Sequence, residues 1–168
     1  MTRPLPSRTR ASESPSPGTL EHIRTNLPSP STALFGRDDE LAVLLDLVAT
    51  ARLVTVSGPG GSGKTRLALE VARRAAEGFD AVWFVALEHI PDPNDVMGAL
   101  ARAMGLPEAP GVDADERVLD HLRARNVLLL LDNLEHVIDA APLIGHVARA
   151  GPEVRVLVTS QIPLRLGG

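Results

Sequence analysis

The sequence predicts an α/β fold, a three-layer αβα sandwich whose middle layer is a parallel sheet. Short runs of β-branched and aliphatic residues alternate along the chain with longer segments of helical periodicity. This alternation is typical of parallel strands joined by crossover helices. Two of the runs, 81–87 and 127–131, are apolar at every position. Strands without a polar face are expected where helices cover both sides of a sheet.

The first half of the chain is expected to form a helix, a strand, a second helix and a second strand. Asp38 can cap a helix over 39–49, in which apolar residues recur on one face. Strand 53–57 is a short β-branched run. Helix 65–77 places its apolar residues at the i, i+3, i+4 and i+7 spacing, and strand 81–87 completes this half.

The second half repeats the alternation. Asp92 and Pro93 are the cap and the first-turn proline of a helix that stops near Gly105. Pro142 interrupts or restarts the last helix, because proline has no backbone N–H to donate. The elements after Gly105 are, in order, a loop, a helix, a strand, the helix with the proline and a last strand: 106–114, 115–125, 127–131, 136–149 and 154–158.

The composition indicates a single aliphatic domain. The chain has 168 residues, of which 44% are hydrophobic and 2% aromatic, so about one domain is expected. A net charge of −4 argues against direct DNA binding, which usually needs a basic face. The lack of cysteine excludes disulfides and cysteine-ligated metals and suits the cytoplasm. The apolar runs 81–87 and 127–131 are both too short to span a membrane.

Residues 1–30 differ from the rest of the chain. They contain six of the 14 prolines, many serines and threonines, and few large apolar residues. A segment of this kind cannot bury enough apolar surface to offset the entropy lost on ordering. We therefore expect a disordered leader over 1–30 and a folded domain over 31–168.

The loop between strand 53–57 and helix 65–77 carries the most specific motif. It fits the pattern G-x-x-x-x-G-K-[ST] of the phosphate-binding P-loop, and a strand before it and a helix after it are the context that this motif requires. Its glycines let backbone N–H groups converge on phosphate oxygens, and the helix N-terminus adds its positive dipole end. The motif consists of Gly58, Pro59, Gly60, Gly61, Ser62, Gly63, Lys64 and Thr65.

Lys64 is the only lysine among the 17 basic residues. Every other cation is arginine, so this composition uses arginine wherever a general positive charge is enough. A P-loop needs a compact, flexible ammonium that fits between backbone and phosphate, and a planar guanidinium does not fit there. The single lysine therefore points to binding of a nucleoside triphosphate.

Asp132 follows the apolar strand 127–131, at the end where that strand emerges from the sheet. With the Thr65 hydroxyl it can hold Mg²⁺ against the β and γ phosphates. An isolated aspartate after a strand more often caps the next helix, but the P-loop upstream reverses that preference. We therefore expect Thr65 and Asp132 to be the magnesium ligands.

Hydrolysis also needs a residue that orients the attacking water. Asn133 follows Asp132 and is neutral, hence a poor base. Glu135 is the nearest remaining acid, although a solvated residue in the first turn of the next helix is an equally good interpretation. Polar residues at 159–161, after the last strand, can read the γ-phosphate, or can simply mark the transition from strand to loop. These residues predict tight nucleotide binding with slow hydrolysis.

Taken together, the motifs resemble the NB-ARC-like ATPase module of the STAND class. The likeness is greatest to the ATP-binding domain of large bacterial LuxR-type and SARP-type transcriptional regulators, and it spans about residues 26 to 166. The segments that carry it are Asn26-Leu27-Pro28, Phe35-Gly36-Arg37-Asp38, 53–68, 82–85, Leu131-Asp132-Asn133-Leu134-Glu135-His136 and 156–160.

This resemblance implies that 31–168 is a P-loop ATPase domain of the NB-ARC or AAA-like kind, truncated at its C-terminal end and lacking the last strand of the full domain. Without that strand, the P-loop strand 53–57 is expected at an exposed edge of the sheet. The family usually has arginine as its γ-phosphate sensor where this chain has Gln161. Arg165 is a weak substitute for that sensor.

The resemblance also implies the function: an Mg-ATP/ADP switch that governs assembly in signal transduction, with self-association or a protein partner, and with no direct DNA contact by this chain. An active NTPase or kinase on a small substrate and an inert or partner-binding remnant stay open as alternatives. The expected catalytic residues are Lys64, Asp132 and Glu135. The expected nucleotide contacts are Arg37, Gly58, Pro59, Gly60, Gly61, Ser62, Gly63, Lys64, Thr65, Arg66 and Gln161.

Overall fold

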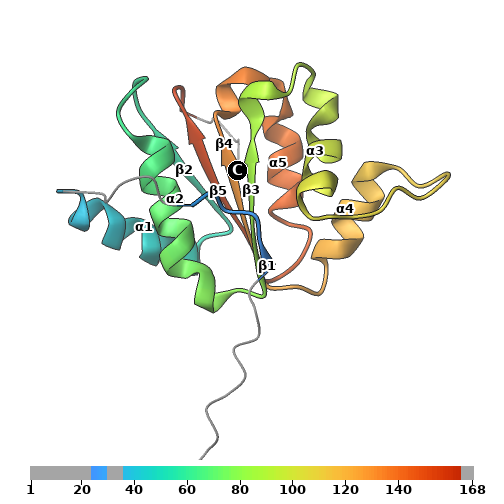
Figure 1. Cartoon of the computed structure of the whole chain (residues 1–168), viewed down its shortest axis with the longest axis horizontal. Helices are drawn as coiled ribbons and strands as arrows, with labels where there is room; N and C mark the ends of the chain where they lie inside the picture. Colours follow the sequence, from blue (N-terminus) through green and yellow to red (C-terminus); the bar gives the residue numbers. More distant parts are fainter. Residues whose placement is uncertain (1–23, 30–35, 164–168) are drawn as a thin grey trace, which may run out of the picture.

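Five parallel strands form one sheet in the computed structural model, which describes residues 24–29 and 36–163 (Figure 1). The strands lie in the order β1-β3-β4-β5-β2, and each neighbouring pair is parallel. The predicted α/β fold with a parallel sheet is therefore confirmed. The strands are β1 Arg24–Thr25, β2 Leu53–Ser57, β3 Ala81–Ala86, β4 Val127–Asp132 and β5 Val154–Ser160.

Helices cover both faces of this sheet (Figure 1). The α-helices are α1 Asp38–Thr50, α2 Lys64–Ala75, α3 Val96–Ala103, α4 Ala114–Leu122 and α5 Ala141–Val147. Short 3-10 segments join some of them to the strands: η1 Ala76–Gly78, η2 Leu87–His89, η3 Pro93–Asp95 and η4 Leu134–Ala140.

The side chains of the central strand β4 explain why helices pack on both faces of the sheet. Leu128 and Leu130 pack into a core cluster with α1 and α2, whereas Leu129 and Leu131 pack into a second cluster with α3, α4 and α5. All four leucines are fully buried. Each buried leucine contributes about 1.5–3 kcal/mol relative to an exposed one, so the apolar run that predicted this strand also stabilises both layers.

Two helix starts differ from the prediction. Asp38 is the first residue of α1 and not its cap; the cap position is Arg37, which makes no side-chain cap hydrogen bond. The acidic residues in the first turn of α1 instead stabilise the helix by interacting with the positive end of its dipole. The predicted helix 136–149 is two segments, because the backbone leaves the helical region at Val137 and α5 starts afresh with Pro142 in its first turn. Pro142 therefore restarts the helix.

Residues 24–29, which the sequence analysis placed in the leader, are part of the sheet edge in the structure. Arg24 and Thr25 pair with β3. The Asn26 amide then takes the place of a third ladder residue: its Nδ2 donates to the Phe84 carbonyl at 2.9 Å and its Oδ1 accepts from the Phe84 N–H at 2.6 Å. This amide covers a sheet edge that β1 leaves open after two residues. The rest of the predicted leader lies outside the described residues.

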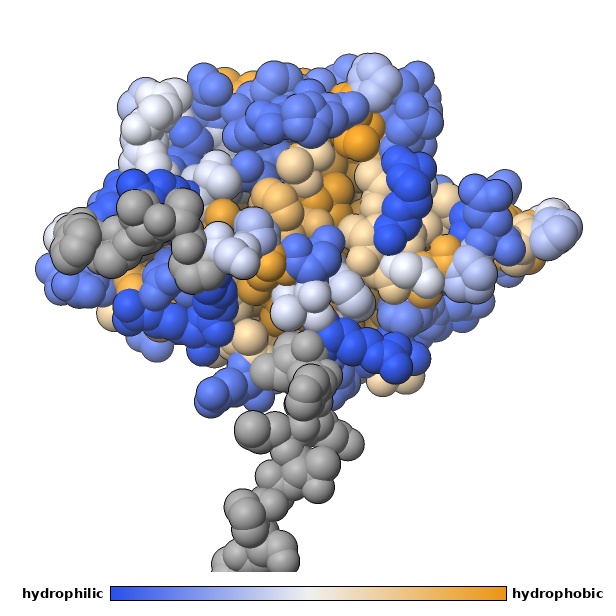
Figure 2. All heavy atoms as spheres, viewed as in Figure 1, coloured by the Kyte–Doolittle hydropathy of each residue, from blue (hydrophilic) through white to orange (hydrophobic). Residues whose placement is uncertain are grey.

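At the other edge of the sheet, β2 pairs with β5 and has no second neighbour within the described ranges. The strand that leads into the P-loop is thus an edge strand, as expected. No helix of the described part is long and apolar enough to cross a membrane. Figure 2 shows an apolar band in the middle of this view with hydrophilic surface on both sides of it.

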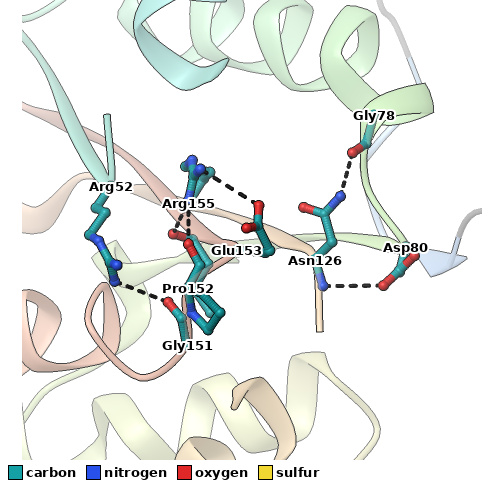
Figure 3. Close-up of polar contacts among 9 residues, drawn as sticks. Arg52, Gly78, Asp80, Asn126, Gly151, Pro152, Glu153 and Arg155 are labelled. Atoms are coloured by element: carbon teal, nitrogen blue, oxygen red, sulfur yellow. Dashed lines mark hydrogen bonds and ion pairs between the residues drawn. The ribbon is translucent and has the colours of Figure 1, made fainter. Parts of the chain in front are cut away.

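The amino ends of the strands are tied together by side chains that bond to turns (Figure 3). Asn126 Nδ2 donates to the Gly78 carbonyl at 2.6 Å, and its backbone N–H donates to Asp80 Oδ2 at 3.1 Å. Arg52 Nη1 donates to the Gly151 carbonyl at 3.1 Å. These hydrogen bonds hold together loops that are far apart in the sequence but meet at the amino ends of the strands.

Gly151 is required at its position for a steric reason. A Cβ atom there would lie 2.6 Å from the Leu122 carbonyl oxygen and 2.9 Å from that of Arg123. Both atoms belong to backbone at the end of α4, so no side-chain rotation can make room. Next to it, Arg155 donates to the carbonyls of Pro152 and Val154 at 3.0 and 3.1 Å.

Candidate nucleotide site

The glycine-rich loop joins β2 to α2 at the carboxyl ends of the strands. Gly58 N–H donates to the Ser160 carbonyl at 3.3 Å, which anchors the loop to the end of β5. Gly63 occupies the cap position of α2 with φ 82°. That left-handed conformation favours glycine, and it turns the chain so that the helix begins at Lys64.

Lys64 is buried although it is charged. Its side chain is only 8% exposed, and Nζ donates to the Pro59 carbonyl at 2.8 Å. An ammonium has three N–H donors, and Pro59 is its only acceptor among the described residues. A buried cation with unused donors is costly unless an anion completes its shell, so the loop is built to receive negative charge at this point.

Thr65 and Asp132, the two predicted magnesium ligands, are in direct contact. Thr65 Oγ1 donates to Asp132 Oδ1 at 2.8 Å, and Asp132 is only 5% exposed. Thr159 Oγ1 donates to the same carboxylate oxygen at 2.5 Å and accepts the Asn133 N–H at 3.0 Å. These contacts fix the carboxylate of Asp132 beside the first turn of α2.

This oxygen-rich pair fits Mg²⁺ by its chemistry, because the ion prefers hydroxyl and carboxylate oxygens and keeps several waters. The described residues contain no group of three or more His, Cys, Asp or Glu that could hold a metal alone. A site made of Thr65 and Asp132 would therefore depend on phosphate oxygens and water for its remaining ligands.

Asn133, the residue after Asp132, makes its side-chain hydrogen bond with Glu88. It adopts a left-handed backbone with φ 60°, and its Nδ2 donates to Glu88 Oε2 at 3.0 Å. A left-handed turn directly after β4 is one that asparagine tolerates better than most residues. Asn133 thus shapes the turn that follows Asp132.

Glu135 and Gln161 lie together next to the P-loop. Glu135 Oε2 accepts the Gln161 N–H at 3.1 Å, whereas Glu135 Oε1 is buried and has no partner among the described residues. The Gln161 side chain lies 3.6 Å from the position that a Cβ on Gly60 would occupy. Gln161, the residue at the sensor position, therefore links Glu135, the predicted water-orienting acid, to the P-loop.

Arg37 braces the P-loop from outside. Its Nη1 donates to the Ser62 carbonyl at 2.9 Å, and its Nε lies 2.6 Å from Glu40 Oε2. A Cβ on Gly63 would lie 3.4 Å from Arg37 Nη1, so this glycine also leaves room for the guanidinium. Arg66 is exposed on the first turn of α2.

The structure brings the predicted residues to one end of the sheet, and it adds Thr159 to the network as the second donor to Asp132. The sequence analysis treated 159–161 only as possible γ-phosphate readers. The parallel register could have revealed Thr159, because β4 and β5 pair at Leu131 and Val158, and the next residue of each strand is then Asp132 and Thr159.

Comparison with known protein families gives a match to the AAA ATPase domain over residues 33–146. The chain is also similar to a putative HTH-type transcriptional regulator of Mycobacterium tuberculosis, with 42% identity over 123 residues. That match covers 73% of this chain and 14% of the relative. The regulatory protein AfsR of Streptomyces griseus is 30% identical over 167 residues, covering 91% of this chain and 17% of the relative.

The chain thus spans only 14% to 17% of the length of these regulators. Their likeness to this chain agrees with the resemblance to large bacterial transcriptional regulators stated from the motifs.

Among solved structures, the fold is similar to Cdc6p from Pyrobaculum aerophilum, with a TM-score of 0.60, 18% identity, and coverage of 80% of this chain and 42% of that one. The ORC2 protein of Aeropyrum pernix gives a TM-score of 0.61 with 18% identity, over 76% of this chain and 41% of that one. At this level of identity the likeness concerns the fold.

Proposed function

The chain belongs to the AAA ATPase domain family, and on that premise we propose that it binds Mg-ATP and ADP as the nucleotide switch of a signal-transduction ATPase. The observation that carries the proposal is the buried Lys64 ammonium beside the Thr65 and Asp132 pair. A phosphate anion would pair with the Lys64 ammonium, and a divalent cation bound to that anion would pair with the oxygens of Thr65 and Asp132. Mg²⁺, when bound, would neutralise phosphate charge at Thr65 and Asp132.

A hollow beside the P-loop supports binding of a whole nucleotide. It has a volume of about 500 Å³ and lies between α1, β2 and the start of α2. Its walls combine charged residues of both signs with apolar ones: the basic Arg37 and Lys64, the acidic Asp39 and Glu40, and the apolar Leu44, Val56 and Leu67. Phosphates on Lys64 and a planar base against the apolar wall would use both kinds of surface.

Slow hydrolysis is the second part of the proposal. Asn133 donates to Glu88, and Gln161 carries no charge at the sensor position. Neither can serve as a strong base or as a cationic γ-phosphate contact. The site would therefore hold nucleotide for long periods, which suits a switch that a partner reads in the cytoplasm.

One observation favours a hydrolysing NTPase as the second candidate. Glu135 Oε1 is buried and has no partner among the described residues. A free carboxylate oxygen next to the P-loop is able to accept a proton from water. Steady-state phosphate release decides between the two: turnover that is rapid and lost in Glu135→Gln favours the enzyme, whereas slow release unchanged by that substitution favours the switch.

Calorimetric titration of the full chain with Mg-ATP tests the shared premise. Removing a charged hydrogen-bond donor costs about 1.5–3 kcal/mol, so Lys64→Ala should weaken binding by roughly ten- to a hundredfold. Arg149→Ala, which removes an exposed cation at the end of α5, is the charge-matched control and should bind as the wild type does. Equal affinity in Lys64→Ala and wild type would reject the proposal.

A further inference from the structure

A second hollow lies at the opposite end of the sheet from the P-loop, near β1. Its volume is about 610 Å³, and it is lined by residues from β1, η1, β3 and α4 and from the segments that lead into β3 and β4. Its basic residues are Arg24, His121 and Arg125, and its aromatic wall is formed by Phe79 and Trp83. No residue of the P-loop belongs to this hollow.

Neither Arg24 nor Arg125 has a side-chain partner among the described residues. Ion pairs fix other arginines on this surface, for example Arg123 with Asp120 at 2.8 Å, but no such contact forms at Arg24 or Arg125 within the described ranges. Guanidinium groups that converge on one hollow repel each other. The arrangement is therefore stabilised by whatever anion enters it.

The pKa of His121 is sensitive to the positive charge in the hollow. Burial is the main cause that lowers the pKa of His121, and the charges of Arg125 and Arg24 lower it further. Both arginines thus act on the same imidazole.

The hollow also contains acids, and they do not neutralise the arginines. Asp80 uses Oδ2 to accept the Asn126 N–H at 3.1 Å, and Glu77 is exposed in the middle of η1. Neither acid lies within ion-pair distance of Arg24 or Arg125. Neither contributes to the lowered pKa of His121, whose causes are burial and the two arginines.

We propose that this hollow is a binding site for a small organic anion, held by the guanidinium groups of Arg24 and Arg125 against the aromatic wall of Trp83. Guanidinium groups match the paired oxygens of both carboxylate and phosphate. The Trp83 indole N–H is itself buried and has no acceptor among the described residues. The site would let a metabolite act on the domain at a distance from its nucleotide.

Trp83 makes this proposal directly measurable, because it is the only tryptophan of the chain. Its fluorescence in the full chain is titrated with citrate in one arm and with pyrophosphate in the other. We expect a saturable change with at least one probe. Citrate alone would identify a carboxylate ligand, and pyrophosphate alone a phosphate ligand.

Three variants separate this site from other anion binding. Arg24→Gln and Arg125→Gln should each weaken binding at least tenfold, whereas Arg123→Gln, a charge-matched change at a residue outside the hollow, should leave it unchanged. Lys64→Ala should also leave it unchanged, because the P-loop is not involved. Arg125 lies in the loop between α4 and β4, so Arg125→Gln keeps the test valid if Arg24→Gln disturbs β1.

The proposal is overturned if neither probe gives a saturable change. It is equally overturned if Lys64→Ala abolishes the change, because the anion would then be at the P-loop, or if Arg123→Gln weakens binding as much as Arg125→Gln, because the attraction would then be a general effect of charge.

Discussion

The two ends of this sheet use polar side chains in different ways. At the carboxyl end, Lys64, Asp132 and Glu135 are buried or half-buried, and each keeps some hydrogen-bonding capacity unused. At the amino end, Asn126 and Arg52 bond to the backbone of turns, and the hollow with Arg24 and Arg125 is an exception. A polar group that satisfies a turn fixes a loop, whereas a buried polar group with spare capacity marks a place for a ligand.

If this distinction is correct, substitutions at the amino end should change stability without changing nucleotide binding, and those at the carboxyl end should do the reverse. The largest expected effect is at Gly151. A Cβ there would lie 2.6 Å from backbone oxygen, so Gly151→Ala should lower the free energy of unfolding by about 3 kcal/mol or more. Urea unfolding measures this loss, with Gly78→Ala as the control because a Cβ on Gly78 meets nothing within 4 Å.

At the carboxyl end, Asp132→Asn should weaken Mg-ATP binding by about 1.5–3 kcal/mol, the cost of losing a charged group from such a network. The free energy of unfolding should change far less. Calorimetry with and without Mg²⁺ provides the measurement, and the exposed Asp139→Asn serves as the matched control. Magnesium-dependent affinity that survives in Asp132→Asn would remove this carboxylate from the site.

A smaller stability effect is expected at Asn126. Asn126→Ala loses the 2.6 Å hydrogen bond from Nδ2 to Gly78, which is worth about 1 kcal/mol. Urea unfolding should detect this loss, while the affinity for Mg-ATP stays at the wild-type value. Asn94→Ala, in which an exposed asparagine bonded to Asp92 is lost, gives the comparison. An Asn126→Ala protein with weakened nucleotide binding would contradict the division between the two ends.

The smallest effect concerns pH. The folded state holds the pKa of His121 below its ordinary value through burial and the charges of Arg125 and Arg24. The unfolded chain therefore takes up this proton at a higher pH, and stability should fall as the pH drops through about 6.5.

In His121→Gln the fall should be shallower, while the exposed His146→Gln should follow the wild type. Glu77 and Asp80 line the same hollow as His121. Identical pH profiles for wild type and His121→Gln would contradict the lowered pKa.

The sequence predicted the fold well because its signals were local. The apolar run that became β4 and the glycine motif before α2 each specify their own backbone. The site required one more step, since Thr159 is recognisable only once β5 is known to lie beside β4. The roles of all the predicted site residues in catalysis, nucleotide contact or metal binding stay predictions.

The features that the sequence analysis missed depend on contacts between distant segments. From the sequence, Asn26 is assigned to a polar leader. In the structure its amide bonds both backbone groups of Phe84, 58 residues away. The hollow with Arg24 and Arg125 depends in the same way on β1 lying next to β3. No local sequence pattern predicts either arrangement.

Hydrogen exchange of the full chain, with and without Mg-ATP, tests the central claim that nucleotide binds at the carboxyl end of the sheet. We expect new protection at residues 58–65, 132–135 and 159–161, and unchanged exchange at residues 78–80, 126 and 151–155. Protection confined to the amino end, or no protection at 58–65, would contradict it.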